Sequence, residues 1–398
     1  MSEWKEVRLG DIVTVKSGYA YKGKYISNKG KNILLGMGCV SYNDKFLYSG
    51  ARAYDEDCDE RYCAKAGDIV LATRQQSDSL PILAMPAIIP DSLFDKKIIV
   101  GTNLYLIKND SDIDNHFLFW LLKTPNYVNY ISSVKTGTTV RMVTKKDVEN
   151  YIFKCPSKEE RDTISNILWG IDAKIETNNK LNDKLEEMAQ AIFKSWFVDF
   201  EPFKDKPFHE TELGMIPEGW EVGSILDIAE LFDSQRKPLS SMEREYMKGK
   251  YPYYGATSIM DYIDKYIFDG TYLLMGEDGS VVKENGNPYL QYVWGKFWPN
   301  NHAHVMQGRN GYSTEMLYCL LSITDVSSIV TGAVQMKISQ RSMSRLLTVI
   351  PSKSVCNKFN TIIRPIFDII KRIWEENDRL ASLRDTLLPR LMSGELIV

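Results

Sequence analysis

Apolar residues recur at alternating spacings of three and four in two long stretches of the chain, one after Pro156 and the other after Pro351. A period of about 3.5 residues is typical of a coiled-coil seam, so each stretch predicts one long helix. About 40 residues at about 1.5 Å each give a helix about 60 Å long. The predicted seam positions are Ile164, Leu168, Ile171, Ile175, Asn178 and Leu185 in the first stretch and Ile366, Ile369, Ile373, Leu380, Leu383 and Leu387 in the second.

Local signals add detail to these two helices. Ser157 and Glu160 form a capping-box pattern directly before the first apolar run. Polar seam residues such as Asn178 cost stability but fix the register of a helix pair. Pro365 is expected to kink the second helix. If the helices pack antiparallel, they hold the two globular parts at a fixed distance; alternatively, they belong to ordinary domain cores.

The residues that precede each long helix repeat without a gap. SVKTGTTVRMVTKKDVENYIFKCP (133–156) aligns with SIVTGAVQMKISQRSMSRLLTVIP (328–351), so that Gly137 matches Gly332 at an offset of 195 residues. This offset far exceeds the periods of about 20–50 residues found in solenoid proteins. We therefore predict an internal duplication of one domain followed by one helix.

The duplication predicts two tandem α/β (α+β) domains, each followed by its helix. The expected boundaries are 1–156 for the first domain, 157–200 for its helix, 201–219 for a linker, 220–351 for the second domain and 352–398 for its helix. Prolines and mixed charges indicate that the linker is an extended connector.

Composition restricts the class of protein. The chain has 398 residues, of which 44% are hydrophobic and 25% charged, as in an ordinary globular protein. No apolar run reaches the about 18 residues of a membrane span. The six cysteines form no C-x-x-C pair, which favours reduced thiols in the cytoplasm. The net charge of −3 lacks the basic excess of many nucleic-acid binders, so any DNA site must consist of local patches.

Catalytic motifs are missing from the sequence. It contains neither the G-x-x-x-x-G-K-[ST] loop of P-loop NTPases nor a G-x-G-x-x-G cofactor loop between a strand and a helix. Asn287-Pro288-Tyr289 lacks the second proline of an adenine methyltransferase loop. His302 and His304 would need a third ligand to bind a metal, and hydrogen bonding within a strand is the favoured interpretation. We expect no catalytic residue and no metal.

Basic and aromatic side chains alternate in several segments, which is a pattern typical of nucleic-acid binding. Lysine and arginine neutralise phosphates, whereas Arg, Gln and Asn can also bond to base edges. Any one of these residues could equally be a solvated surface residue. The candidate DNA-binding residues are Tyr21, Lys22, Lys24, Arg74, Gln75, Gln76, Arg141 and Lys145 in the first half and Arg236, Lys237, Tyr253, Tyr254, Asn301, His302, Gln335 and Lys337 in the second.

Longer motifs extend this picture over nearly the whole chain. KYPYYGATSIMDYIDKYIFDGTYLLMGEDG (250–279), NNHAHV (300–305), TGAVQMKISQRSMSRLLTVIP (331–351) and the ends of both halves (178–202 and 376–396) resemble the specificity subunits of type I restriction–modification enzymes. The resemblance implies two target recognition domains and two helices that pair as an antiparallel spacer. It also implies that each domain reads one part of a split double-stranded DNA target.

The same resemblance implies which partners and cofactors to expect. A non-catalytic chain of this family docks two methyltransferase subunits and restriction subunits in the cytoplasm. S-adenosylmethionine, ATP and Mg would be used by those partners, and this chain would bind no cofactor. The two halves differ between residues 17 and 100, so the target is expected to be asymmetric. The rival hypotheses are a self-sufficient DNA methyltransferase and a coiled-coil scaffold that binds only protein.

Overall fold

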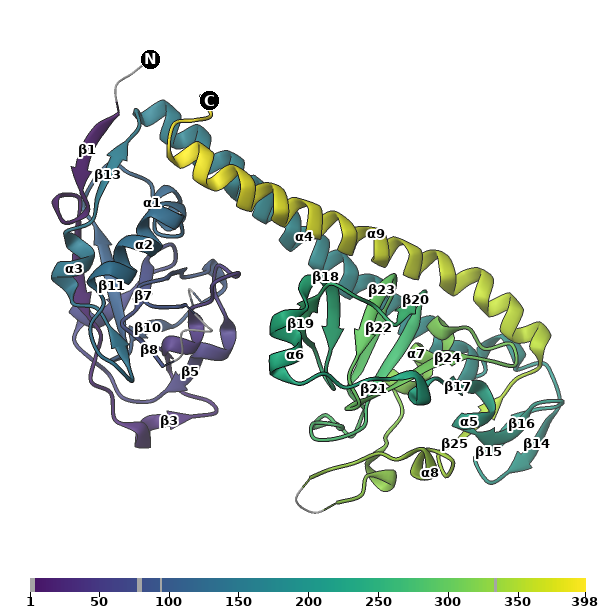
Figure 1. The fold of residues 1–398 in the computed structure, drawn as a ribbon. Coiled ribbons are helices and arrows are strands. Elements are labelled where there is room, and N and C mark those ends of the chain that lie inside the picture. Colours follow the sequence, from purple (N-terminus) through teal and green to yellow (C-terminus); the bar gives the residue numbers. More distant parts are fainter. Residues whose placement is uncertain (1–3, 77–80, 94, 333–334) are drawn as a thin grey trace. The chain divides into compact units, whose positions relative to one another are not determined.

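A computed structural model describes residues 4–76, 81–93, 95–332 and 335–398. The chain divides into two compact units, Met1–Thr177 with Glu376–Val398 and Asn178–Glu375. Each unit contains a domain rich in β-strands, which we call the first and the second domain (purple to blue and green in Figure 1), and a part of both long helices. Among the described residues, no helix is both long and apolar enough to cross a membrane.

The first domain is built on two larger sheets. The strand order of one is β2 (Val13–Ser17), β11 (Leu104–Asn109), β7 (Ile69–Ala72) and β9 (Pro86–Ile88). The other contains β3 (Ile26–Ser27), β5 (Ala51–Tyr54), β4 (Asn32–Leu35), β10 (Lys97–Val100) and β6 (Cys63–Ala64). Short pairs join β1 (Lys5–Arg8) to β13 (Ile152–Cys155) and β12 (Arg141–Met142) to β8 (Arg74–Gln75). Helices α1 (Asn115–Leu121), α2 (Pro125–Val134) and α3 (Lys145–Glu149) complete this domain.

The second domain repeats this plan. One sheet has the order β17 (Ala229–Leu231), β24 (Ala303–Gly308), β21 (Tyr272–Gly276) and β22 (Leu290–Val293). The other contains β19 (Ile259–Ile263), β18 (Lys248–Tyr254), β23 (Lys296–Pro299) and β20 (Phe268–Asp269). β16 (Glu221–Ser224) pairs with β25 (Leu347–Ile350) as β1 does with β13. The helices of this domain are α5 (Ile225–Ile228), α6 (Ser241–Tyr246), α7 (Thr314–Ser322) and α8 (Gln340–Met343).

Hydrogen-bonding patterns show that the two domains are copies of one fold. Each has an antiparallel four-stranded sheet with the same order, and each has one parallel pair in its other sheet, β4 with β10 and β18 with β23. The two-domain α/β (α+β) fold and the internal duplication predicted from the sequence are therefore confirmed.

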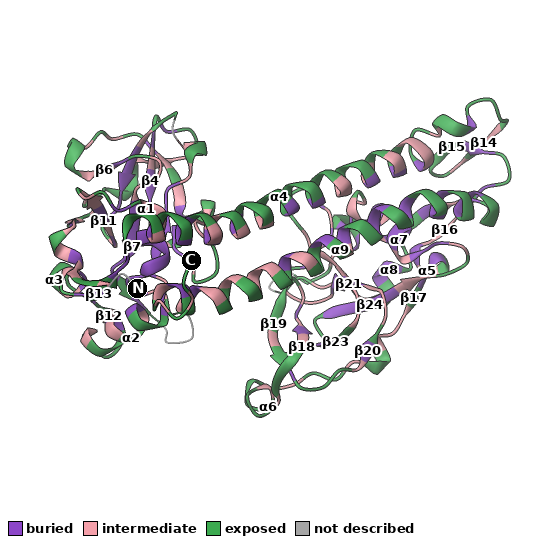
Figure 2. Ribbon diagram, turned by 90° about the horizontal axis from the view of Figure 1, so that it is seen from above, coloured by how far each residue is buried: buried purple, intermediate pink, exposed green. Residues whose placement is uncertain are grey.

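The long helices α4 (Lys158–Phe197) and α9 (Lys353–Met392) lie antiparallel within each unit, and both alternate buried with exposed positions (Figure 2). In the unit of the first domain, Asp172 of α4 accepts a 2.8 Å hydrogen bond from Arg384 of α9. In the other unit, Phe193 and Phe197 of α4 pack edge-on against Phe359 of α9. The predicted antiparallel helix pair is confirmed.

The buried stripe of α9 differs from the predicted seam. Ile369 and Leu383 are 44% and 48% exposed, whereas the neighbouring Ile370 is buried. The stripe follows the domain cores: Ile363, Ile366, Phe367 and Ile370 join the core of the second domain, and Arg384 takes the inward position beside Leu383 to pair with Asp172. Among the other predicted positions, Ile164, Leu168, Asn178, Ile366 and Ile373 are buried and Ile171, Ile175, Leu185, Leu380 and Leu387 are half-buried.

Two further expectations meet a different local structure. Pro365 lies inside α9, which is continuous from Lys353 to Met392, so the helix does not end there and the kink stays a prediction. The segment 201–219 was expected to be an extended connector, but it contains a 3-10 turn and a hairpin of β14 (Phe208–Thr211) and β15 (Gly214–Pro217). Phe203 and Ile216 from this segment are buried with Trp220 in the core, which explains why the segment is folded.

Candidate nucleic-acid interface

The repeated Thr-Gly motif forms the same turn in both domains. Thr136 and Met142 exchange backbone hydrogen bonds of 2.9 Å and 2.9 Å, and Thr331 and Lys337 exchange bonds of 2.9 Å and 2.8 Å. Gly137 has φ +88° and Gly332 has φ +89°, a left-handed conformation that glycine adopts without strain. We call residues 135–145 the first TG loop, and residues 330–332 and 335–340 the second TG loop.

Both TG loops lead directly into a capped helix. The Thr144 hydroxyl accepts a hydrogen bond from the backbone of Asp147 at the start of α3, and the Ser339 hydroxyl does so from Ser342 at the start of α8. These caps satisfy backbone N–H groups that a short helix would otherwise leave unpaired. The same backbone hydrogen bonds and the same kind of helix cap therefore flank corresponding residues in the two domains.

In the first domain, the fold brings together residues that are far apart in the sequence. Arg141 of the first TG loop pairs across the strands with Gln75, and Met142 pairs with Arg74. The Gln75 side chain is buried and accepts a hydrogen bond from the backbone of Leu83 (3.1 Å), which is a structural role. Arg74, Gln76 and Lys145 are exposed, and Arg141 is half-buried.

Tyr21, Lys22 and Lys24 lie at a different part of the first domain. Tyr21 is 36% exposed and lines a surface pocket together with Arg52, Thr102 and Asn103. Lys22 bonds to Glu56 (3.2 Å). Lys24 Nζ lies 4.8 Å from the ring centre of Tyr25.

In the second domain, Arg236, Asn301, His302 and Lys337 gather around the carboxylates of Glu277 and Asp278. Arg236 donates to Glu277 (2.7 Å) and to the Ala303 carbonyl (2.6 Å). Lys337 Nζ lies 3.3 Å from a carboxylate oxygen of Glu277 and 3.3 Å from one of Asp278. His302 lies 3.9 Å from Asp278, and the Asn301 carbonyl oxygen lies 3.5 Å from Arg236.

The other candidates of the second domain differ in exposure. Lys237, Asn301, His302 and Gln335 are exposed, and Tyr254 is half-buried. Tyr253 is only 1% exposed, and its hydroxyl accepts a hydrogen bond from the backbone of Leu239 (2.9 Å). Tyr253 is therefore an interior residue and not an exposed DNA-binding residue as the sequence suggested.

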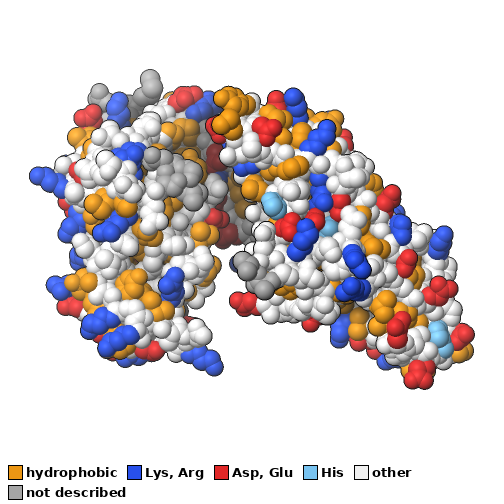
Figure 3. Space-filling view, turned by 60° about the horizontal axis from the view of Figure 1, so that its bottom comes forward, with side chains coloured by type: hydrophobic (Ala, Val, Ile, Leu, Met, Phe, Trp, Pro, Cys, Tyr) orange, Lys and Arg blue, Asp and Glu red, His pale blue; other side chains and the backbone are white. Residues whose placement is uncertain are grey.

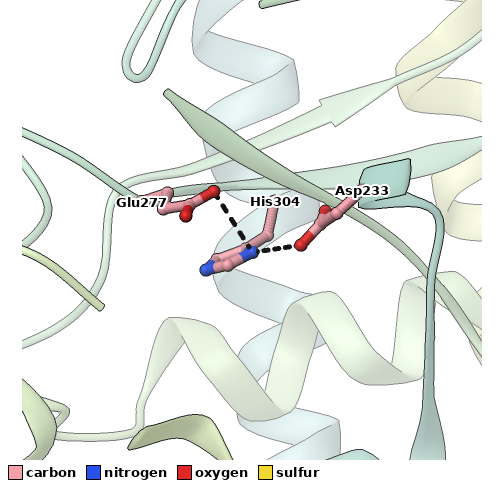
Figure 4. Close-up of side chains that lie close together, drawn as sticks. All are labelled: Asp233, Glu277 and His304. Carbon is pink, nitrogen blue, oxygen red and sulfur yellow. Dashed lines mark hydrogen bonds and ion pairs between the residues drawn. The ribbon is translucent and has the colours of Figure 1, made fainter. Parts of the chain in front are cut away.

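Sequence reasoning missed the residues at the centre of this group, which are Asp233 and Glu277 (Figure 4). His304 on β24 is fully buried; its Nδ1 lies 2.6 Å from Asp233 and 3.7 Å from Glu277. Its Nε2 lies 2.7 Å from the carbonyl oxygen of Ile338 in the second TG loop. The only signal in the sequence was a histidine at an inward position of an otherwise apolar strand, Ala303–Met306.

These three side chains are of the kinds that bind metals, and they lie within 4.8 Å of one another. Ligand atoms lie about 2.0–2.2 Å from a zinc ion, so two ligands on one ion are about 3 Å or more apart. The Nδ1 of His304 and the carboxylate of Asp233 are closer than that, at the distance of a hydrogen bond. Arg236 and Lys337 already neutralise Glu277, so the group is an ion-pair network rather than a metal centre.

Charges of both signs are interspersed on the surface (Figure 3), as expected from the net charge of −3. The candidate interface therefore consists of separate loops, with the two TG loops as its repeated element.

Comparisons with known proteins identify the family of this chain. The family described as the Type I restriction modification DNA specificity domain matches residues 1–187 and 217–376, which is most of the chain. The chain belongs to this family. It is a DNA-recognition subunit of a type I restriction–modification system and not itself a catalytic one, as the resemblance of its motifs implied.

Individual relatives of the specificity-subunit family are distant in sequence. The MjaIX specificity subunit of Methanocaldococcus jannaschii is 26% identical over 302 residues, covering 71% of this chain and 69% of its own. The HindI specificity subunit of Haemophilus influenzae is 23% identical over 485 residues and matches 100% of both chains. A crystal structure of an S subunit from M. genitalium shares the fold, with a TM-score of 0.54, 17% identity and coverage of 98% of this chain and 96% of that chain.

Proposed function

We propose that this specificity subunit reads an asymmetric, bipartite double-stranded DNA target and directs adenine methylation and restriction by its partner subunits. The observation that carries the proposal is the duplicated TG loop, in which the two domains share the glycine conformation and the paired backbone hydrogen bonds but carry different side chains. Arg141 and Lys145 of the first loop correspond to Met336 and Gln340 of the second. Two copies of one scaffold with different polar side chains are suited to reading two different base sequences.

Basic residues of the first domain would supply affinity in this proposal. Arg74, Arg141 and Lys145 lie on or beside the β8–β12 pair and the start of α3. A lysine in the first turn of a helix opposes the helix dipole, so Lys145 is better explained by an anionic partner than by helix stability. Phosphate contacts position a protein on DNA, whereas base contacts give specificity, and Gln76 and Gln335 are the exposed amides suited to base contacts.

Partner subunits would dock on the long helices. In the unit of the second domain, α9 exposes Ile362, Ile369 and Trp374, and α4 exposes Leu181 and Met188. Large exposed apolar side chains on these helices support a docking surface for a partner protein. We propose that two methyltransferase subunits cover such helical surfaces and that restriction subunits join this assembly.

The cofactors belong to the partners in this account. S-adenosylmethionine would be bound by the methyltransferase subunits, ATP and Mg would be used by the restriction subunits, and this chain would bind none of them. The cytoplasm, where the DNA lies, is the expected location. The helix pair would set the length of the unread gap between the two half-sites.

Co-expression with a methyltransferase subunit of the same system, followed by sequencing of methylated bases, tests this function. We expect one motif with two specified parts, a fixed gap and methylated adenines. The purified chain alone should not methylate DNA, and DNA binding should appear in gel shifts when the methyltransferase is added. Methylation by the chain alone, or a continuous motif without a gap, would contradict the proposal.

A further inference from the structure

In each domain, the antiparallel sheet that contains β11 or β24, which we call the central sheet, holds the TG loop through one residue, but that residue differs. In the first domain, the Tyr105 hydroxyl on β11 donates a 3.0 Å hydrogen bond to the carbonyl oxygen of Val143. In the second domain, His304 on β24 bonds through Nε2 to the carbonyl oxygen of Ile338. Val143 and Ile338 are equivalent positions of the repeat, 195 residues apart.

The strand pairing shows that Tyr105 and His304 are themselves equivalent. Thr73 donates its backbone N–H to the Asn103 carbonyl (3.0 Å), and Glu277 donates to the His302 carbonyl (2.8 Å). Each of these bonds lies at the end of the same strand pair, β7 with β11 and β21 with β24. Tyr105 lies two residues after Asn103, and His304 lies two residues after His302. The two domains therefore place different residues at the same position, and both residues bond to the TG loop.

The two hydrogen bonds of His304 require both ring nitrogens to carry a proton. A carbonyl oxygen only accepts, so Nε2 must donate to Ile338. The Asp233 carboxylate also accepts from the backbone of Val305 (2.9 Å) and from Gln340 (2.6 Å). Burial alone would raise the pKa of Asp233, but these bonds and His304 together lower it below its ordinary value, so the carboxylate is ionised and accepts from Nδ1. A neutral ring would place a lone pair against either Asp233 or Ile338.

Charged groups from every neighbouring element surround this ring. Asp233 and Arg236 come from the segment after β17, Glu277 and Asp278 from the end of β21, and Lys337 from the second TG loop. The carboxylates of Asp233 and Glu277 lie 2.6 Å and 3.7 Å from Nδ1 of the ring, and Arg236 and Lys337 pair with these carboxylates. Burial alone would lower the pKa of His304, but Asp233, the Ile338 carbonyl and Glu277 together raise it above its ordinary value.

We propose that His304 is a positioning residue for DNA recognition: its imidazolium fastens the second TG loop to the central sheet, and loss of one proton releases that loop. The consequence, which rests on the proposed function, is that one half of the DNA target becomes pH-sensitive while the half read through the Tyr105-held loop does not. Burial raises the pKa of the Tyr105 hydroxyl above its ordinary value of 10.0, so this hydroxyl keeps its proton at neutral pH.

The sign of the pH effect follows from the direction of the histidine shift. Because the pKa of His304 is higher in the folded protein, its contribution is complete below the ordinary pKa of histidine. It is lost as the pH rises through the raised value. Recognition of the half-site read by the second domain should therefore weaken at alkaline pH.

We call the hydrogen bond from His304 to Ile338 the clamp. Amide hydrogen exchange of the full-length chain tests, in the absence of DNA, whether the clamp holds the second TG loop. Exchange in 335–343 and in 140–148, corrected for intrinsic rates, is compared from about pH 6 to pH 9, a range that brackets histidine titration. Protection of 335–343 should fall by up to about tenfold per pH unit above the His304 pKa, while 140–148 stays constant. Parallel behaviour of the two segments would overturn the proposal.

Asp233→Asn is the decisive variant. The asparagine amide can donate to a neutral His304 Nδ1 and its oxygen can still accept from Val305, so the clamp should persist at every pH. Exchange in 335–343 should then become independent of pH. A pH profile that matches the unchanged protein would contradict the proposal that His304 is protonated on both ring nitrogens.

Tyr105→Phe is the matched variant of the first domain, and it should increase exchange in 140–148 equally at all pH values. A loss of protection on adding EDTA would overturn the proposal in favour of a metal.

The functional readout uses the complex with its methyltransferase and duplexes substituted in one half-site at a time. Discrimination at one half-site should weaken as the pH rises, and Asp233→Asn should restore it. Binding to DNA with equal pH dependence at both half-sites would overturn the clamp and leave the proposed function intact. Absence of sequence-specific binding at every pH would instead contradict the proposed function, while the exchange experiment would still judge the clamp.

Discussion

Gly137 and Gly332 adopt the same left-handed backbone conformation in the two domains, and each faces the carbonyl oxygen three residues later. A Cβ atom built on either glycine would lie 2.1 Å from that oxygen, on Val140 in one domain and on Gln335 in the other. The duplicated sequence motif is therefore a duplicated backbone geometry. Side chains such as Arg141 and its counterpart Met336 differ between the halves.

Alanine at Gly332 should disturb only the second domain. The left-handed conformation and the backbone clash together should lower the free energy of unfolding by more than about 2 kcal/mol, measured by denaturant unfolding. Gly137→Ala should do the same in the first domain. Each substitution should relax recognition of a different half-site, as seen in the methylated motif.

Gly295→Ala is the control for the glycine substitutions. Gly295 also has a positive φ, +74°, but nothing lies within 4 Å of the place that a Cβ atom would take there. Its replacement should cost about 1 kcal/mol from backbone strain alone and leave the motif unchanged. Equal effects of Gly295→Ala and Gly332→Ala would show that the close contact in the TG loop is unimportant.

The Asp172–Arg384 pair should contribute measurably to the helix pair. Both side chains are largely buried, so Asp172→Ala removes the buried partner of the guanidinium and leaves only the exposed Asp385 paired with it. We expect a loss of about 2–3 kcal/mol in unfolding free energy. Lys174→Ala removes the exposed pair of Lys174 with Glu376 and should cost less than about 1 kcal/mol. Similar losses for both variants would refute the buried role of Arg384.

Tyr253 and Tyr21 should separate stability from DNA binding. Tyr253→Phe removes the hydroxyl that accepts from Leu239, so unfolding free energy should fall by about 1–2 kcal/mol with an unchanged methylated motif. Tyr21→Ala alters an exposed ring and should change stability by less than about 0.5 kcal/mol while weakening DNA binding in gel shifts. A changed motif in Tyr253→Phe would show that this interior ring does contact DNA.

Features set by nearby residues could be predicted from the sequence. The capping box at Ser157 and the apolar periods of the long helices depend on residues only a few positions apart. The register of α9 could not be predicted in the same way. Whether Ile369 or Ile370 faces inward depends on contacts such as Phe367 with Tyr292, which only the folded domain brings together.

The candidate interface shows the same limit. Loops rich in basic and aromatic residues indicated DNA binding, but composition did not distinguish an exposed Lys145 from a largely buried Arg236. The bond between Asp233 and His304 joins residues 71 positions apart, and no local pattern announces it. The equivalence of Tyr105 and His304 likewise emerged from strand register, because their surrounding sequences differ.

The central claim is that each domain independently reads one half of a split DNA target. It is tested most directly by replacing residues 1–156 with the corresponding domain of another specificity subunit and sequencing the methylated bases in cells that carry the methyltransferase. The account predicts that one half of the motif changes while the other half is retained. A change in both halves, or in neither, would contradict it.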